Sequence, residues 1–102
     1  MPGWKFVTNH AMVLCLIVKQ PRTTAREISL SLGITERTTH NIISDLEADG
    51  YITKTREGRR IRYGIDAELP LRHKMQQDKV IGDLLEVLVW EKRRKPVKSA
   101  AG

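Results

Sequence analysis

The chain has 102 residues and a net charge of +6, with a pI of about 9.8. This length suits one small domain, and the charge favours a polyanionic partner, with nucleic acid ahead of an acidic membrane surface. The single cysteine excludes an intrachain disulfide, and no apolar segment reaches the length of a membrane span, so we expect a cytoplasmic protein without a membrane partner.

The first predicted element is a helix over residues 9–19. Thr8 or Asn9 can cap its start, and Pro21 follows its end. The run is apolar nearly all round, so periodicity alone does not exclude a strand, but its length and the proline favour a buried helix. Cys15 lies among aliphatic neighbours in this run and is predicted to be a buried small hydrophobe; a redox-sensing role stays open.

Two capped helices follow, separated by a very short turn. The pair Thr24 and Glu27 has the spacing of a capping box, which predicts a helix over residues 24–32 that ends at Gly33. A third helix is predicted over residues 35–49, where an apolar stripe recurs at helical spacing. Two short helices joined this way indicate a helix-turn-helix.

A basic hairpin comes next, with strands predicted over residues 51–56 and 60–65 and a turn over 56–59 in which Gly58 can take positive φ. Residues 54–62 hold five basic side chains against one acidic one, Glu57. Such density is mildly costly through self-repulsion unless phosphates or a narrow minor groove balance it, although a solvated basic hairpin remains an alternative.

The last predicted element is a helix from Pro70 to about Arg94, followed by a disordered tail over residues 96–102. The predicted organisation is therefore a DNA-binding domain over 1–66 and a C-terminal helix over 67–95. The apolar face of this helix is wide enough to predict a homodimer; the alternative is a helix folded back on its own domain. The expected interface residues are Ile81, Leu84, Leu85 and Leu88.

The third helix would present its polar face to the bases of duplex DNA, since the second helix of a helix-turn-helix enters the major groove. Arg37 can pair with guanine and Asn41 with adenine in bidentate fashion, while Asp45, Glu47 and Asp49 are expected to point away from DNA. A solvated helix face explains the same pattern and stays open. The predicted DNA-binding residues are Thr24, Arg37, Thr38, His40, Asn41, Ser44, Lys54, Arg56, Arg59, Arg60 and Arg62.

The blocks TNHAMVLCLIV, GITERTTHNIISDLEADGYITKTREGRRIRYGI and ELPLRH resemble a family of small bacterial and archaeal winged helix-turn-helix transcriptional regulators, distant relatives of the MarR and ArsR types. The resemblance covers residues 4–90, and its most specific parts are GITERT, DLEADGYI and REGRR. It implies a mainly α fold with a three-helix core, a small β-hairpin as the wing and a long C-terminal helix. It also implies a commonly dimeric DNA-binding regulator.

The resemblance places Arg37, His40, Asn41 and Ser44 at recognition positions and Arg59 and Arg60 at the wing tip. Such regulators often carry a longer basic or amide pair where His40 and Asn41 stand, which leaves the target sequence open. The metal ligands of the ArsR type are not matched.

No catalytic arrangement is evident in the sequence, so we expect a protein that is not an enzyme and needs no cofactor or metal. The predicted function is sequence-specific binding of double-stranded DNA by a homodimeric regulator. The expected effect on transcription is repression, by occlusion of the binding site. The alternatives are a winged-helix scaffold for protein contacts and a nonspecific nucleic-acid coat. An effector pocket would have to lie between the last helix and the body, and no residue pattern marks one.

Overall fold

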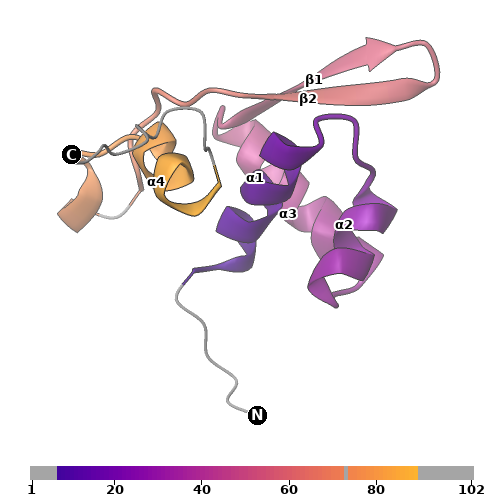
Figure 1. The fold of residues 1–102 in the computed structure, drawn as a ribbon, viewed down its shortest axis with the longest axis horizontal. Helices are drawn as coiled ribbons and strands as arrows, with labels where there is room; N and C mark the ends of the chain where they lie inside the picture. The colour runs from indigo at the N-terminus through magenta and orange to yellow at the C-terminus, as the bar shows by residue number, and fades with distance from the viewer. Residues whose placement is uncertain (1–6, 73, 90–102) are drawn as a thin grey trace, which may run out of the picture.

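The computed structural model describes residues 7–72 and 74–89, in which four helices pack beside a two-stranded hairpin (Figure 1). In chain order the elements are α1 (Asn9–Lys19), α2 (Ala25–Leu32), α3 (Glu36–Ala48), β1 (Ile52–Glu57), β2 (Arg60–Ile65) and α4 (Ile81–Leu88). This arrangement is a winged helix-turn-helix fold, as predicted.

The first three helices begin and end at the predicted signals. Thr8 caps α1, and Thr24 and Glu27 form the complete capping box at the start of α2. Gly33 takes a left-handed conformation with φ of 71° at the end of α2, and Thr35 caps α3 by accepting a hydrogen bond from the backbone N–H of Thr38. Each cap satisfies a backbone group that the helix itself leaves unpaired.

One hydrophobic core joins the helices to the base of the hairpin. The buried stripe of α3 lies against α1 and α2. Tyr51, just before β1, and Tyr63, within β2, close the core from the hairpin side. The buried apolar side chains are Val13, Leu14, Ile17, Ala25, Ile28, Ile42, Ile43, Leu46, Tyr51, Ile52, Tyr63, Ile81 and Leu85.

The hairpin is regular from its base to its tip. Its strands pair antiparallel from Ile52↔Ile65 to Glu57↔Arg60, which leaves a two-residue loop of Gly58 and Arg59. The predicted turn was one residue too early, because Glu57 remains in the ladder. Gly58 has φ of 64°, the positive value that the first position of such a loop requires and that glycine adopts without strain.

The prediction of one long helix from Pro70 to Arg94 is wrong within the described residues. Pro70 instead pairs with Val80 in an isolated antiparallel bridge, a 3₁₀ turn covers Lys74–Gln76, and α4 begins only at Ile81. The Asp83 carboxylate accepts a hydrogen bond from the backbone N–H of Val80 at 3.0 Å and so caps the helix. The polar run QQDK at 76–79 interrupts the apolar stripe, so no continuous helical face favours a longer helix. The predicted helix end at 94 and the tail over 96–102 lie outside the described residues.

The short α4 packs against α1 (Figure 1). Ile81 and Leu85, two of the residues expected at a dimer interface, are covered by the chain's own core, and Leu84 is half-buried against it. The outer face of α4 carries Val87 and Leu88, which are 81% and 40% exposed. The fold-back arrangement therefore accounts for Ile81 and Leu85, and the remaining apolar surface of α4 is smaller than predicted.

Candidate nucleic-acid interface

The polar face of α3 is fully presented to solvent. The opposite face of the helix is buried, whereas five polar side chains of α3 are exposed: Arg37, Thr38, His40, Asn41 and Ser44. Thr38 also takes part in the helix cap, because its hydroxyl oxygen accepts a hydrogen bond from the hydroxyl of Thr35 at 2.9 Å. All five side chains predicted to face DNA on this helix are thus sterically available to a ligand.

Three acidic side chains at the C-terminal end of α3 each contact a basic group from another element. Asp45 accepts a hydrogen bond from His10 of α1 at 2.9 Å, and Asp49 pairs with Arg72 of the connector. Glu47 lies 3.4 Å from Nζ of Lys54 on β1. These contacts reduce the negative field near the polar face of α3. The contact with Glu47 also means that Lys54 is the one predicted wing residue whose charge has an acidic partner within the described chain.

The arginines of the wing do not form one patch. Residues directly opposite each other in an antiparallel pair share a face of the sheet, so Arg56 lies with Ile61 on one face. Arg62 lies opposite Thr55, and Arg60 lies opposite Glu57, on the other face. All of these arginines are exposed, yet a single ligand surface cannot engage both faces of the wing equally.

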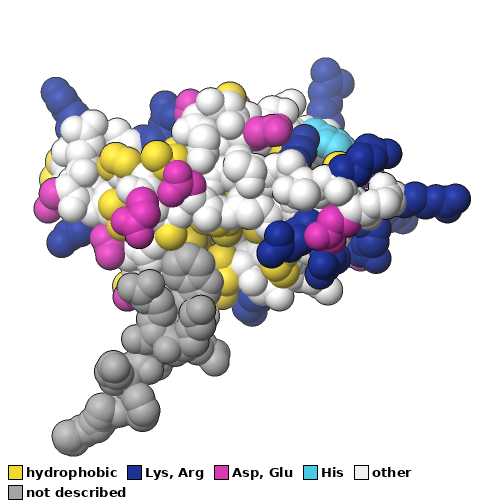
Figure 2. Space-filling view, turned by 90° about the horizontal axis from the view of Figure 1, so that it is seen from above, with side chains coloured by type: hydrophobic (Ala, Val, Ile, Leu, Met, Phe, Trp, Pro, Cys, Tyr) yellow, Lys and Arg dark blue, Asp and Glu magenta, His cyan; other side chains and the backbone are white. Residues whose placement is uncertain are grey.

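A concave basic surface lies between the start of α2, the first turns of α3 and the wing, and we call it the basic groove. It has a volume of about 550 Å³. Four arginines line it against a single acid, and the charged and histidine side chains of its lining are Arg22, Arg26, Arg59, Arg60, Glu36 and His40. Figure 2 shows Lys and Arg side chains crowding the end of the molecule that carries the wing tip, while Asp and Glu predominate toward the α4 end.

Three contacts fix the wing against the segment that enters α2. The backbone N–H of Tyr63 donates to the carbonyl oxygen of Pro21 at 2.8 Å, so this segment pairs with the free edge of β2. Arg22 donates from Nε to Oε1 of Glu57 at 2.8 Å, and Arg60 donates from Nη2 to the backbone oxygen of Arg22 at 3.2 Å. The groove is therefore built by residues that lie far apart in the chain.

The basic groove brings together Thr24, His40, Arg59 and Arg60 from the predicted set, whereas Arg56, Arg62 and Lys54 are not among its lining residues. It adds Arg22 and Arg26, which are not among the residues predicted from the sequence. Both flank the Thr24 cap, and a basic residue beside a capped helix start was the signal that could have singled them out.

The described residues contain no group of three or more His, Cys, Asp or Glu side chains placed to hold a metal ion. Over the same part of the chain, no helix combines the length and apolar character needed to cross a membrane. Cys15 is half-buried on α1, and this burial raises the pKa of its thiol despite the opposing effect of Lys19.

Residues 9–53 match the family described as winged helix-turn-helix DNA-binding. The match spans α1, α2, α3 and the first residues of β1, so it contains the whole helix-turn-helix. No curated protein matches the chain. The observed winged helix-turn-helix fold agrees with this family match, and the match supports a DNA-binding regulator.

Proposed function

We propose that this protein is a sequence-specific regulator of transcription that binds double-stranded DNA, with α3 in the major groove and the wing on the adjacent backbone. One observation carries the proposal: the exposed face of α3 borders the basic groove, because Glu36 and His40 of α3 line it together with arginines of the wing and of α2. A helix end beside a concave cluster of arginines suits a duplex, which presents base edges flanked by phosphates.

In this arrangement the two surfaces have different tasks. Arg37 and Asn41 stand outward on α3 and have the side chains that read guanine and adenine in the major groove. Arg26, Arg59 and Arg60 hold phosphates of the strand that runs along the basic groove, which supplies affinity without sequence information. Lys54 and Arg22 contribute less than these arginines, because Glu47 lies beside Lys54 and Glu57 lies beside Arg22.

We further propose that two copies associate and that the complex represses by occlusion of its site. The apolar side chains left for a partner on α4 are Val87 and Leu88, since Ile81 and Leu85 are used inside the fold. A two-fold pair of such domains would place two α3 helices in successive major grooves and would require a near-palindromic site.

Selection of bound sequences from a random pool of duplexes tests the proposal, followed by affinity measurements for the selected and a random duplex over a salt series. An enriched inverted repeat with half-sites about one helical turn apart is the expected result. Salt-sensitive binding without an enriched motif would instead favour a nonspecific coat. Absence of salt-sensitive binding would overturn the proposal in favour of a protein-binding scaffold.

A further inference from the structure

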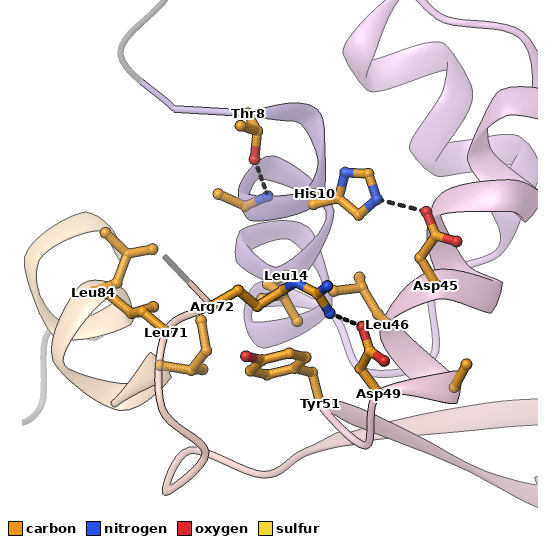
Figure 3. A pocket seen from close by; sticks show the side chains of 13 residues that line it. Thr8, His10, Leu14, Asp45, Leu46, Asp49, Tyr51, Leu71, Arg72 and Leu84 are labelled. Carbon is orange, nitrogen blue, oxygen red and sulfur yellow. Dashed lines mark hydrogen bonds and ion pairs between the residues drawn. The ribbon is translucent and has the colours of Figure 1, made fainter. Parts of the chain in front are cut away.

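A second pocket lies between α1, the C-terminal half of α3 and the chain that leads into α4, and we call it the α1–α4 pocket (Figure 3). Its volume is about 590 Å³, within the range of sites that hold small organic molecules. Most of its surface is apolar, and the large apolar side chains that line it are Leu14, Leu46, Tyr51, Leu71, Ile81 and Leu84. None of the predicted DNA-binding residues lines this pocket.

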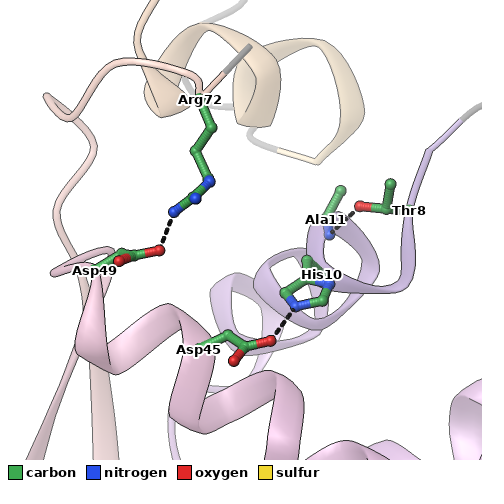
Figure 4. A network of polar contacts seen from close by, with 6 residues as sticks. All are labelled: Thr8, His10, Ala11, Asp45, Asp49 and Arg72. Atoms are coloured by element: carbon green, nitrogen blue, oxygen red, sulfur yellow. Dashed lines mark hydrogen bonds and ion pairs between the residues drawn. The ribbon is translucent and has the colours of Figure 1, made fainter.

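The charged and histidine side chains of the α1–α4 pocket come from α1, the C-terminal end of α3 and the connector. Asp45 and Asp49 are one helical turn apart and both line the pocket, where Asp45 meets His10 and Asp49 meets Arg72 (Figure 4). With histidine counted as neutral at pH 7, as in the chain's formal charge, two carboxylates face one cation. The pocket is thus net negative within a protein whose net charge is +6.

The two carboxylates are not equivalent. Asp49 is paired with the permanently charged guanidinium of Arg72, whereas the partner of Asp45 is the imidazole of His10, which lies at hydrogen-bond distance of 2.9 Å. Asp45 lies in the last turn of α3 and Asp49 is its C-cap residue, so both acids lie where the carbonyl end of the helix adds negative potential. An ammonium group placed beside Asp45 would gain a charge-assisted hydrogen bond, while a carboxylate at the same place would be repelled.

We propose that the α1–α4 pocket binds a small organic cation, an ammonium group carried on an apolar body. The apolar body packs among Leu14, Leu46 and Leu84, and the ammonium group binds Asp45 in exchange for His10. The ring of Tyr51, whose hydroxyl donates to the carbonyl oxygen of Pro70, offers a cation–π surface on the floor of the pocket.

Binding in this pocket is coupled to DNA through α3, and this second step rests on the proposed function. The same helix carries Asp45 in the pocket and Asn41 one turn earlier along nearly the same face. A ligand that breaks the contact between His10 and Asp45 changes how α3 is held against α1, so cation binding and DNA affinity are linked reciprocally.

The first test is direct and uses no DNA. Titration calorimetry on the full chain compares 4-phenylbutylammonium with 4-phenylbutanol and 4-phenylbutyrate, which share the apolar body and differ in charge. We expect the ammonium compound to bind at least about tenfold more tightly than the alcohol, and the carboxylate most weakly of the three. Methyl NMR shifts should locate the ammonium compound at Leu14, Leu46 and Leu84.

Two charge-matched variants make the assignment specific. Asp45→Asn should remove the preference for the ammonium compound over the alcohol while the alcohol still binds, because the apolar lining is intact. Asp78→Asn makes the same charge change on the exposed connector outside the pocket and should leave the preference unchanged. The proposal is overturned by equal binding of the three probes, by their failure to bind, or by equal effects of the two variants.

The coupling is tested separately by measuring the affinity for the selected duplex with and without 4-phenylbutylammonium. A change in DNA affinity that Asp45→Asn removes supports the linkage. An unchanged DNA affinity overturns the linkage but not the pocket, and failure of all DNA binding would count against the proposed function alone.

Discussion

Arg22 donates to the carboxylate of Glu57 at 2.8 Å and so joins the entry of α2 to the end of β1. Glu57 is the one acidic residue between residues 52 and 65, so the wing's single negative charge is used to hold an arginine of the basic groove. Arg60 adds a second connection through the backbone oxygen of Arg22. The pair therefore fixes the wing at the cost of reducing the positive field that DNA would meet.

The first prediction concerns this pair. Glu57→Gln should raise the affinity for specific and random duplexes alike by about twofold to tenfold, because it removes a negative charge and releases Arg22 for a phosphate. Stability should change by less than about 1 kcal/mol, since both partners are partly exposed and such pairs contribute little. Fluorescence anisotropy with both duplexes measures the effect. Glu68→Gln, on the connector, is the matched control, and an equal gain there would mean that only the net charge matters.

The double variant Arg59→Ala with Arg60→Ala should weaken binding to all duplexes by a similar factor. If both arginines hold phosphates, the slope of log affinity against log salt should become shallower by about 0.9 for each lost contact. The control is Lys74→Ala with Lys79→Ala, which removes the same charge from the connector to α4. An unchanged salt slope in the arginine variant would place the wing tip outside the interface.

Asn41→Ala should act on specificity instead. If the amide pairs with an adenine, the loss should be about 1–3 kcal/mol on the selected site and close to zero on random DNA. The affinity ratio of the two duplexes at one salt concentration is the measurement. Gln77→Ala removes an exposed amide from the connector and should leave the ratio unchanged. An equal loss on both duplexes would make Asn41 a backbone contact.

The sequence predicted those features that depend on neighbouring residues. Thr24 with Glu27, Gly33 and Thr35 set the helix boundaries because a cap is made by groups within a few residues of one another. The buried stripe of α3 followed from its spacing, and with it the five exposed side chains on the opposite face.

The features that escaped prediction depend on residues far apart in the chain. Arg22 belongs to the basic groove because the wing folds back onto it, and its partner Glu57 lies 35 positions away. The segment before α4 differs from its prediction for a similar reason. The backbone N–H of Ile81 donates to the carbonyl oxygen of Leu69 at 2.7 Å, a contact that a continuous helix from Pro70 would not allow. A local apolar pattern cannot reveal either relationship.

The thiol of Cys15 should react slowly with iodoacetamide. Its burial raises its pKa, so at any pH near neutrality a smaller fraction is thiolate than in a free cysteine, and the thiolate is the reactive form. The rate should stay low at pH 7 and rise only in alkaline solution. The same chain unfolded in urea is the control, where the thiol regains its ordinary pKa. If the folded chain is alkylated as fast as the unfolded chain, the result would favour a redox-sensing role for Cys15.

The two faces of α4 should differ sharply in what they contribute to stability. Leu85 is fully buried against the core, so Leu85→Ala should lower the free energy of unfolding by about 2–5 kcal/mol through lost burial and the cavity left behind. Val87 is 81% exposed on the same helix, and Val87→Ala should change stability by less than about 0.5 kcal/mol in a dilute, monomeric sample. Urea unfolding followed by circular dichroism compares the two variants.

The same residues separate folding from association. If Val87 and Leu88 form the contact between two copies, Val87→Glu should shift sedimentation toward the monomer while the monomer keeps its urea midpoint. If instead Leu85→Ala dissociates a dimer without lowering the stability of the monomer, α4 does not lie on its own core in solution, and the packing of Ile81 and Leu85 described above is wrong.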